Sequence, residues 1–253
     1  MVPRALRDGA TDLLDVLFAK AGVYRQLAPT LVALMDATGS RAWFDLCSGG
    51  GGGALAMRAD LVARGASPAD VTLSDRYRYP NDAARRRVAA LGDATVRYLP
   101  ASVDALDVPR HGAAIRTMFG ALHHFPPSIV QRILQDAVAV RAPIAFFDVA
   151  ASPVLRRMPV ALAPVAALPN LVALFVMALM LVPLARPFRC SRVLWAYVVP
   201  LIPLLFAWDG TVSALRAYTP EELLALATSV PGGEAYRWEA GRAGRSLYLT
   251  GRP

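Results

Sequence analysis

The run Trp43-Phe44-Asp45-Leu46-Cys47-Ser48, followed by five glycines from Gly49 to Gly53, decides the fold. An apolar stretch that ends in an acid and then enters glycine predicts a buried strand, a tight loop and a helix. Glycine leaves the main chain bare, so that a ligand can approach it at the N-terminus of that helix. The loop is not a P-loop, because no Gly-Lys-Ser or Gly-Lys-Thr follows, and its spacing differs from the G-x-G-x-x-G run of dinucleotide-binding folds. A flexible linker is disfavoured because apolar residues flank the glycines closely.

Composition predicts one α/β core with an unusually apolar part. The chain has 253 residues, of which 55% are hydrophobic and 18% are charged, against about a quarter charged in ordinary soluble domains. Its net charge of +8 comes almost wholly from arginine, since Lys20 is the single lysine, and this bias indicates a GC-rich bacterial genome. The arginines are dispersed and not interleaved with aromatic residues, which favours an anionic membrane over nucleic acid as partner.

The N-terminus and the cysteines bear on the compartment. The first residues are not followed by the apolar run of a signal peptide. The two cysteines are Cys47 and Cys190, and Cys47 lies in the glycine loop, so we expect no structural disulfide and a reducing, cytoplasmic compartment.

Strands and helices alternate along the middle of the chain. We expect strands over 42–46, 71–74, 96–99, 115–119 and 143–147, and helices over 54–64, 82–91 and 128–140. Such alternation predicts right-handed crossovers and a parallel sheet with helices on both faces. A helical segment over 12–37, broken at Gly22 and Pro29, comes first. At the other end, a capped helix over 220–227 is followed by strands over 235–239 and 246–250, with a glycine-containing turn over 240–245.

The pattern Asp45-x-Cys47-x-Gly49-x-Gly51 resembles the first motif of class I S-adenosylmethionine-dependent methyltransferases, with cysteine where glycine is commoner. The final helix and hairpin are similar to the elements that complete the seven-stranded Rossmann-like sheet of these enzymes. The resemblance covers about 41–148 and 217–253. We therefore divide the chain into an N-terminal helical cap (1–40), a cofactor-binding core (41–150), an apolar helical insertion (151–208), and a C-terminal helix and hairpin that complete the core (209–253).

Three acids lie at or beyond the ends of successive predicted strands, namely Asp45, Asp75 and Asp104. Ligands of open α/β sheets bind beyond the carboxyl ends of the strands, so these acids are expected to meet there. The resemblance implies that the carboxylate of Asp75 binds the two ribose hydroxyls of S-adenosylmethionine, and that Asp104 or its neighbour contacts the adenine. The complete predicted cofactor set is Asp45, Cys47, Ser48, Gly49, Gly51, Asp75, Arg76, Asp104, Ala105 and Phe119. A nicotinamide enzyme is the competing interpretation, but the chain has no Tyr-x-x-x-Lys pair.

His123 and His124 follow the fourth predicted strand. Methyl transfer to a hydroxyl or an amine requires removal of a proton, and the pKa of histidine lies near neutrality. The resemblance implies that such pairs recur in relatives that act on small molecules and quinones, so either histidine is a candidate base. The alternative is that both only shape the loop. No third ligand with zinc-like spacing accompanies them, and no metal site is predicted.

Asp209, beside Trp208, is a third candidate base. Two other interpretations remain open for Asp209, an ion pair with Arg216 and a place in a capped turn. Substrate contacts are predicted for Tyr24 and Trp208.

The region 158–208 contains two apolar runs, 158–185 and 193–208, flanked by arginines. Prolines interrupt both runs, and the longest proline-free piece, 170–182, would reach only about 20 Å as a helix, whereas a membrane span needs about 30 Å. We expect broken or re-entrant helices that dock peripherally on an anionic membrane surface. The alternative is an apolar lid or a homodimer interface that never meets lipid.

Together these features predict an S-adenosylmethionine-dependent methyltransferase for a small hydrophobic or lipid-like acceptor, at the inner face of the cytoplasmic membrane. Two alternatives remain. The same fold can use the cofactor otherwise, for example by cyclising its aminobutyryl chain, or the chain is a membrane adaptor with an inactive site. The sequence does not decide the acceptor atom or the oligomeric state.

Overall fold

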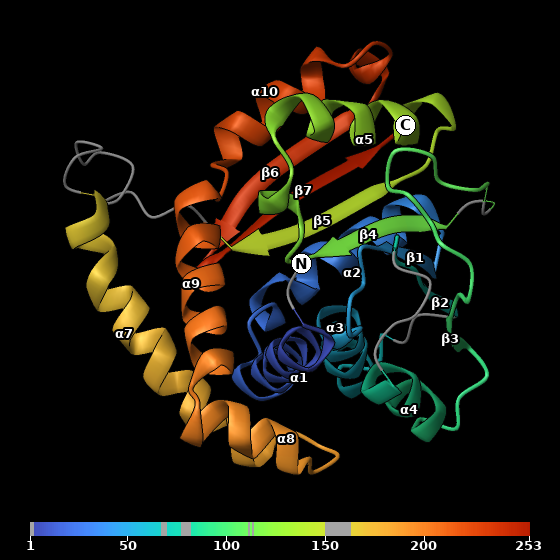
Figure 1. Cartoon of the computed structure of the whole chain (residues 1–253). Coiled ribbons are helices and arrows are strands. Elements are labelled where there is room, and N and C mark those ends of the chain that lie inside the picture. Colours follow the sequence, from blue (N-terminus) through green and yellow to red (C-terminus); the bar gives the residue numbers. More distant parts are fainter. Residues whose placement is uncertain (1–2, 67–69, 77–81, 111, 113, 150–162) are drawn as a thin grey trace.

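The computed structural model describes residues 3–66, 70–76, 82–110, 112, 114–149 and 163–253. Its centre is a seven-stranded sheet in the order β3-β2-β1-β4-β5-β7-β6, which confirms the predicted α/β class (Figure 1). The strands are β1 (Ala42–Leu46), β2 (Asp70–Leu73), β3 (Val96–Tyr98), β4 (Ile115–Phe119), β5 (Ile144–Val149), β6 (Arg237–Ala243) and β7 (Ser246–Arg252). The first five pair in parallel, and β7 lies antiparallel between β5 and β6. The strand order reverses between β1 and β4, where ligands of such sheets bind.

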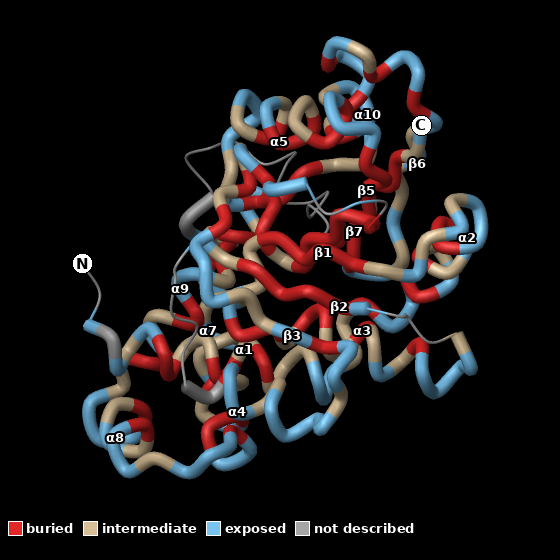
Figure 2. Tube along the Cα trace, turned by 90° about the vertical axis from the view of Figure 1, so that its right-hand side faces the viewer, coloured by how far each residue is buried: buried red, intermediate tan, exposed pale blue. Residues whose placement is uncertain are grey.

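Helices cover both faces of this sheet, and further helices lie outside them. The helices of the described chain are α1 (Arg4–Ala21), α2 (Ala28–Thr38), α3 (Gly52–Ala63), α4 (Asp82–Ala90), α5 (Pro127–Ala139), α7 (Ala163–Leu181), α8 (Cys190–Val193), α9 (Leu201–Arg216) and α10 (Pro220–Ser229). Alternate residues of a strand point to opposite faces, so Phe44 joins the core under α5 and α10 while Trp43 joins the core under α2 and α3. In Figure 2 the strands are largely buried and the outer helix surfaces are exposed.

The helix boundaries follow local chemistry. Gly22 ends α1 in the left-handed conformation, as the sequence predicts, but α1 begins at Arg4, directly after Pro3, and not at residue 12. The predicted break at Pro29 is wrong, because proline fits the first turn of α2. The predicted start of α10 is confirmed by a capping box, in which the Glu222 backbone N–H donates to Thr219 and the Thr219 N–H donates to Glu222. The hairpin turn is shorter than 240–245, since β6 extends to residue 243.

The apolar region is a third helical layer outside the sheet. α7 packs along α9, and both contact α1 (Figure 1). The predicted break at Pro169 is wrong, because Pro169 lies inside the continuous helix α7. The lost backbone hydrogen bond costs about 3 kcal/mol, which packing against α9 offsets. The predicted bend of the second run is present, since the helical segments Cys190–Val198 and Leu201–Arg216 meet at 74° beside Pro200.

α9 also corrects the interpretation of Asp209. The helix runs through the expected boundary at 208 and 209, so Asp209 lies within a helix and not in a capped turn. By length and composition, the segment Val165–Leu184 has the hydropathy of a membrane span and is only 22% buried, while the bent pair is a second candidate. The part of the predicted insertion over 151–162, which includes the flanking arginines Arg156 and Arg157 and the proline at 159, lies outside the described residues.

Candidate active site

The glycine loop follows β1 and leads into α3. Cys47, Gly49 and Gly51 all have positive φ, at 55°, 52° and 79°. This left-handed conformation is easy for glycine and unfavourable for other residues, which is the physical reason that glycine is commoner where Cys47 stands. Gly51 caps α3, so the loop presents backbone N–H groups at the start of a helix, where the macrodipole favours anions.

Asp45 anchors this loop from inside the protein. Its carboxylate is buried and accepts hydrogen bonds from Thr117 Oγ1 at 2.7 Å and from Ser48 Oγ at 2.5 Å. Burial raises the pKa of Asp45 to about 7 from its ordinary 3.8, and the two hydrogen bonds oppose this rise. Asp45 thus fixes the shape of the loop by linking β1, β4 and the residues that follow β1.

The raised pKa of Asp45 predicts a pH-dependent stability. A group with a raised pKa in the folded state contributes stability that is complete below the unfolded pKa and is lost as the pH rises through the folded value. We expect the free energy of unfolding of the wild type, relative to Asp45→Asn, to fall by about 2 kcal/mol from pH 5.5 to pH 8.5. Urea denaturation of both proteins at the two pH values measures this difference. If the difference in the free energy of unfolding between the two proteins is the same at both pH values, the pKa of Asp45 is not raised.

Asp75 and Asp104 lie beyond β2 and β3, beside the loop. The Gly49 N–H donates to Asp75 Oδ2 at 2.9 Å, and Val103 N–H donates to the Asp75 carbonyl at 3.0 Å. Asp104 accepts from the Leu106 N–H at 3.0 Å and pairs with Arg76 at 3.8 Å. The fold therefore brings the acids of three successive strands to one edge, as the sequence predicts.

Open space adjoins this edge. A Cβ placed on Gly49 would meet nothing within 4 Å, whereas one on Gly51 would touch Leu73. The Tyr98 hydroxyl donates to the Gly49 carbonyl at 2.9 Å and holds the loop from the side of β3. The bare backbone at Gly49, with the Asp75 carboxylate beside it, is thus the accessible part of the loop.

Asp15 reaches the loop from α1, a contact that sequence reasoning missed. Its carboxylate accepts the Gly52 N–H at 3.1 Å and pairs with Arg87 of α4, and Arg87 also donates to the Gly50 carbonyl at 3.0 Å. A side chain at Gly50 or Gly52 would overlap Asp15, so these two glycines make room for α1. Burial raises the pKa of Asp15 to about 6, opposed by Arg87. The signal in the sequence was the spacing of three acids, Asp8, Asp12 and Asp15, which places them together on the buried side of α1.

His123 and Asp148 form the second half of the site. His123 lies in the short 3-10 helix Leu122–His124 that follows β4, and its Nδ1 is 2.7 Å from Asp148 Oδ1. The backbone N–H of His123 donates to Asp148 Oδ2 at 2.8 Å. Both side chains are buried. The ionised carboxylate only accepts, so it places the imidazole proton on Nδ1 and leaves the lone pair on Nε2.

Asp148 was missed as a site residue, although it ends the predicted fifth strand. β5 extends to Val149 because it pairs with β7 along its whole length, and Asp148 lies opposite Leu247 inside the strand. The His124 ring lies 4.1 Å from that of His123. Burial and then the neighbouring His123 lower the pKa of His124, which keeps it neutral at physiological pH. His123 is thus the better-positioned base of the two.

A pocket of about 490 Å³ opens beside the histidines. Its lining consists of His123, His124, Phe125, Pro126, Pro127, Arg216, Tyr218 and Glu222. The Tyr218 hydroxyl donates to the Phe125 carbonyl at 2.6 Å and joins the chain after α9 to the loop after β4. This pocket lies at the carboxyl edge of the sheet and suits an acceptor molecule.

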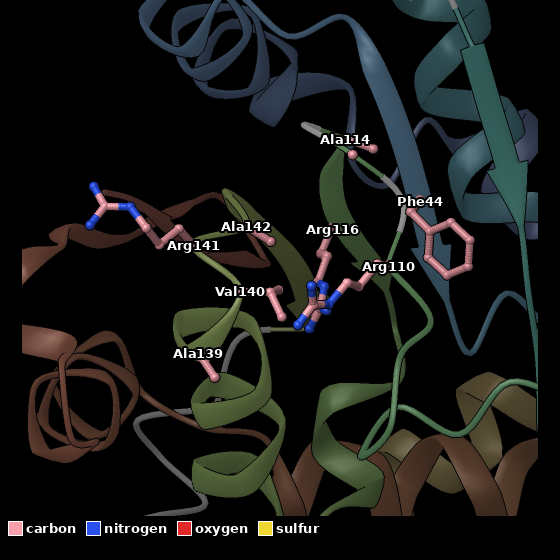
Figure 3. Close-up of a pocket in the computed structure, with 9 residues that line it drawn as sticks. Phe44, Arg110, Ala114, Arg116, Ala139, Val140, Arg141 and Ala142 are labelled. Carbon is pink, nitrogen blue, oxygen red and sulfur yellow. The ribbon is translucent and has the colours of Figure 1, made fainter.

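A second pocket of about 300 Å³ lies at the opposite edge, where β4 and β5 begin (Figure 3). Arg110 and Arg116 point toward one another there, and Arg116 pairs with Asp136 at 2.5 Å. Because it is separated from the glycine loop by the length of the strands, this pocket does not belong to the candidate site.

The remaining predicted residues fall in different places. Asp209 is exposed on α9. Burial lowers the pKa of His124, and the charge of Asp209 opposes this lowering, so Asp209 lies near the histidines. Trp208 is 64% exposed and is not part of the described pocket lining. Phe119 and Tyr24 are buried together at the end of β4, with ring centroids 5.5 Å apart.

Comparison with known proteins identifies the fold. No protein-family model matches the sequence, and no curated protein is significantly similar to it. Among solved structures, the pyocyanin biosynthetic protein PhzM is similar at 16% identity and a TM-score of 0.51 over 92% of this chain and 55% of that chain. Human N-acetylserotonin methyltransferase in complex with S-adenosylmethionine is similar at 12% identity and a TM-score of 0.53, over 94% and 55%.

A putative O-methyltransferase from Nostoc punctiforme is similar at 14% identity and a TM-score of 0.51, over 94% and 60%. The chain has the class I methyltransferase fold. It spans only about half to three fifths of the length of these proteins.

Proposed function

We propose that this chain is an S-adenosylmethionine-dependent methyltransferase. The observation that carries the proposal is the Asp148–His123 pair, which stands across the β1–β4 switch point from the glycine loop in a methyltransferase fold. The residues fit the cofactor, since space is open at Gly49 and the Asp75 carboxylate lies beside it. The N-terminus of α3 completes this cradle.

The protein's own residues then have separate tasks. When bound, S-adenosylmethionine supplies an electrophilic methyl group, so little covalent chemistry is asked of the chain. Asp75 and the loop backbone hold and orient the cofactor. His123 Nε2 removes the proton of a hydroxyl or amine acceptor, while Asp148 keeps the imidazole in the required tautomer and stabilises its protonated form. The pocket beside His123 offers the space for that acceptor.

Asp75 provides the direct test of cofactor binding. A carboxylate that accepts two ribose hydroxyls makes two hydrogen bonds to a charged group, so Asp75→Ala is expected to weaken S-adenosylhomocysteine binding about a hundredfold or more. Isothermal calorimetry measures this affinity. Asp36→Ala, which removes an exposed acid paired with Arg41, is the matched control and is expected to bind normally. If the wild type does not bind S-adenosylhomocysteine, the proposed function is wrong.

The acceptor is proposed to be small and hydrophobic or lipid-like, because the outer layer presents an apolar surface. α7 carries a stripe of exposed side chains spaced three or four residues apart, which places them on one helix face. They are Val165, Leu168, Val172, Val176 and Met180, each 49 to 70% exposed. Phe188, Val198, Leu204 and Trp208 extend the exposed apolar surface onto the following segments. A surface of this kind marks a partner or a membrane.

Charge favours an anionic membrane as that partner. Arg186 and Arg189 flank the exposed Phe188 in the loop between α7 and α8. Arg192, by contrast, is buried, pairs with Asp12 of α1 and donates to the Pro187 carbonyl at 3.0 Å. Arg192 therefore fixes this loop to the core. Of the three arginines at 186, 189 and 192, Arg186 and Arg189 remain for lipid headgroups. We place this contact at the cytoplasmic face of the membrane.

Incubation of the enzyme with labelled S-adenosylmethionine and lipid or metabolite extracts identifies the acceptor by mass spectrometry. Turnover of the cofactor without any added acceptor would instead favour cyclisation of its aminobutyryl chain.

A further inference from the structure

Arg116 is a buried charge on a central strand of the sheet. It is 4% exposed and lies in β4, beside the apolar residues Phe44 of β1 and Ile144 of β5. Arginine is almost never buried unless it is paired, because removal of its charge from water is costly. Asp136 of α5 accepts a hydrogen bond from Nη1 of Arg116 at 2.5 Å, but this guanidinium has no other acceptor among the described residues. Most of its N–H donors therefore remain available to a ligand.

The pocket at the edge where β4 and β5 begin opens onto this guanidinium. It has a volume of about 300 Å³, and Arg110 enters it from the loop before β4 (Figure 3). The Arg110 side chain points toward Arg116 and makes no ion pair or hydrogen bond within the described part of the chain. Two guanidinium groups that face one another repel, so an anion placed between them is attracted by both.

Arg141 adds a third positive charge to the lining. It follows α5 with a φ of 54°, a left-handed position at which glycine is the usual residue, so arginine there has an energetic cost that a charged role explains. Burial raises the pKa of Tyr236 to about 12, and the charges of Arg141 and then Arg116 oppose this rise, which places both arginines near one hydroxyl. The three arginines of the lining, with the one carboxylate paired to them, leave two positive charges in excess.

The rest of the lining is largely apolar. It includes Phe44, Ala114 and Ala142, whose side chains are buried. Small-molecule sites are typically apolar hollows with a few placed polar groups, and a volume of about 300 Å³ is at the lower end of their range. The pocket therefore suits a small molecule that joins a doubly charged anion to an apolar group.

We propose that this pocket binds a small phosphate ester, with the phosphate between Arg110 and Arg116 and an apolar substituent against Ala114 and Ala142. A phosphate monoester carries about −1.5 to −2 charges at neutral pH, which matches the excess charge of the lining. A guanidinium donates parallel N–H groups to two phosphate oxygens, a fit that few other side chains provide. The proposal goes beyond methyl transfer, because this pocket and the glycine loop lie at opposite edges of the sheet.

Calorimetry with phenyl phosphate tests the site in the wild type, in Arg110→Ala and in the control Arg97→Ala. Arg110 is exposed, so its replacement leaves the core intact. Arg110→Ala is expected to weaken binding about tenfold or more, as the loss of hydrogen bonds to a charged group does. Arg97→Ala removes the same charge from an exposed position of β3 and is expected to bind like the wild type. Phenol, which lacks the phosphate, is expected not to bind.

Two further measurements separate this pocket from the cofactor site and from the membrane surface. Saturation with S-adenosylhomocysteine is expected to leave the affinity for phenyl phosphate unchanged. Flotation of Arg110→Ala with anionic phospholipid vesicles is expected to equal that of the wild type, because the ligand is a soluble ester and not a lipid headgroup.

The proposal is overturned if the wild type does not bind phenyl phosphate, if Arg110→Ala binds it like the wild type, or if Arg97→Ala weakens binding as much as Arg110→Ala does. Displacement of phenyl phosphate by S-adenosylhomocysteine also overturns it, and so does a loss of vesicle flotation in Arg110→Ala. These outcomes do not depend on the proposed function, which is tested separately by S-adenosylhomocysteine binding.

Discussion

His123→Ala is expected to lower methyl transfer by about 10² to 10⁴ while S-adenosylhomocysteine affinity stays within about twofold. The loss follows from removal of an imidazole whose Nδ1 is held by Asp148 at 2.7 Å, which leaves the Nε2 lone pair of a pocket-lining residue free to take a proton. Transfer of labelled methyl groups to an extract that contains the acceptor measures the rate. Calorimetry measures the affinity, which separates a lost base from a lost cofactor site.

Asp148→Asn tests the same arrangement without removing the imidazole. The amide would donate to Nδ1, so that the proton moves to Nε2 and the base is lost, and we expect a decrease close to that of His123→Ala. His124→Ala serves as the comparison, because in the described structure His124 makes no contact with Asp148 like that of His123. We expect this variant to lose less than about tenfold in the rate of methyl transfer. Full activity of both His123→Ala and Asp148→Asn would show that the pair only shapes the loop.

The second large effect is expected at the membrane. Changing Leu168, Val172 and Val176 together to serine is expected to reduce binding to anionic phospholipid vesicles by about 10² to 10³, because each buried aliphatic side chain contributes about 1 to 2 kcal/mol to transfer from water. The three side chains are 58, 52 and 49% exposed on one face of α7, so their replacement leaves the cores of the protein intact. Vesicle flotation measures the binding.

The matched control changes three exposed apolar residues elsewhere to serine. These are Val62, Leu91 and Val140, which are 45, 45 and 39% exposed. Vesicle binding by this control is expected to equal that of the wild type. Both proteins are expected to bind vesicles of uncharged phospholipid more weakly than vesicles of anionic phospholipid. Equal flotation of the α7 variant and the wild type would refute membrane contact. A wild-type dimer in sedimentation that dissociates on the α7 substitutions would assign the face to a homodimer interface.

In the candidate site, the sequence predicted local features correctly but missed the contacts between distant residues. The sequence predicted the loop from Cys47 to Gly51, the acids at the ends of β1, β2 and β3, and the histidines after β4, because each of these is a local feature near a strand end. It did not predict the partners of these features. Asp15 approaches Gly52 across 37 positions, Arg87 meets Asp15 across 72, and Asp12 meets Arg192 across 180. Such pairs depend on how helices pack, which hydrophobic periodicity does not specify.

The glycine run illustrates the division most clearly. From the sequence alone, all five glycines were expected to form one ligand-binding loop. The structure instead gives the glycines two different roles. Gly49 and Gly51 provide left-handed turns, and Gly49 remains open to a ligand, whereas Gly50 and Gly52 are bare because α1 lies against them. The left-handed backbone is what requires glycine at Gly49, whereas at Gly50 and Gly52 the atoms that would clash belong to Asp15 of α1.

The sequence by itself thus determined the order of strands and helices, the parallel sheet and the edge at which the acids meet, because backbone geometry ties side-chain periodicity to element type and parallel strands share one carboxyl edge. Only the tertiary structure decided that Asp148 orients His123, that Asp15 and Arg87 close over the glycine loop, and that α7 continues through Pro169. These depend on packing between distant segments, whose contacts offset local preferences such as the helix-breaking effect of proline.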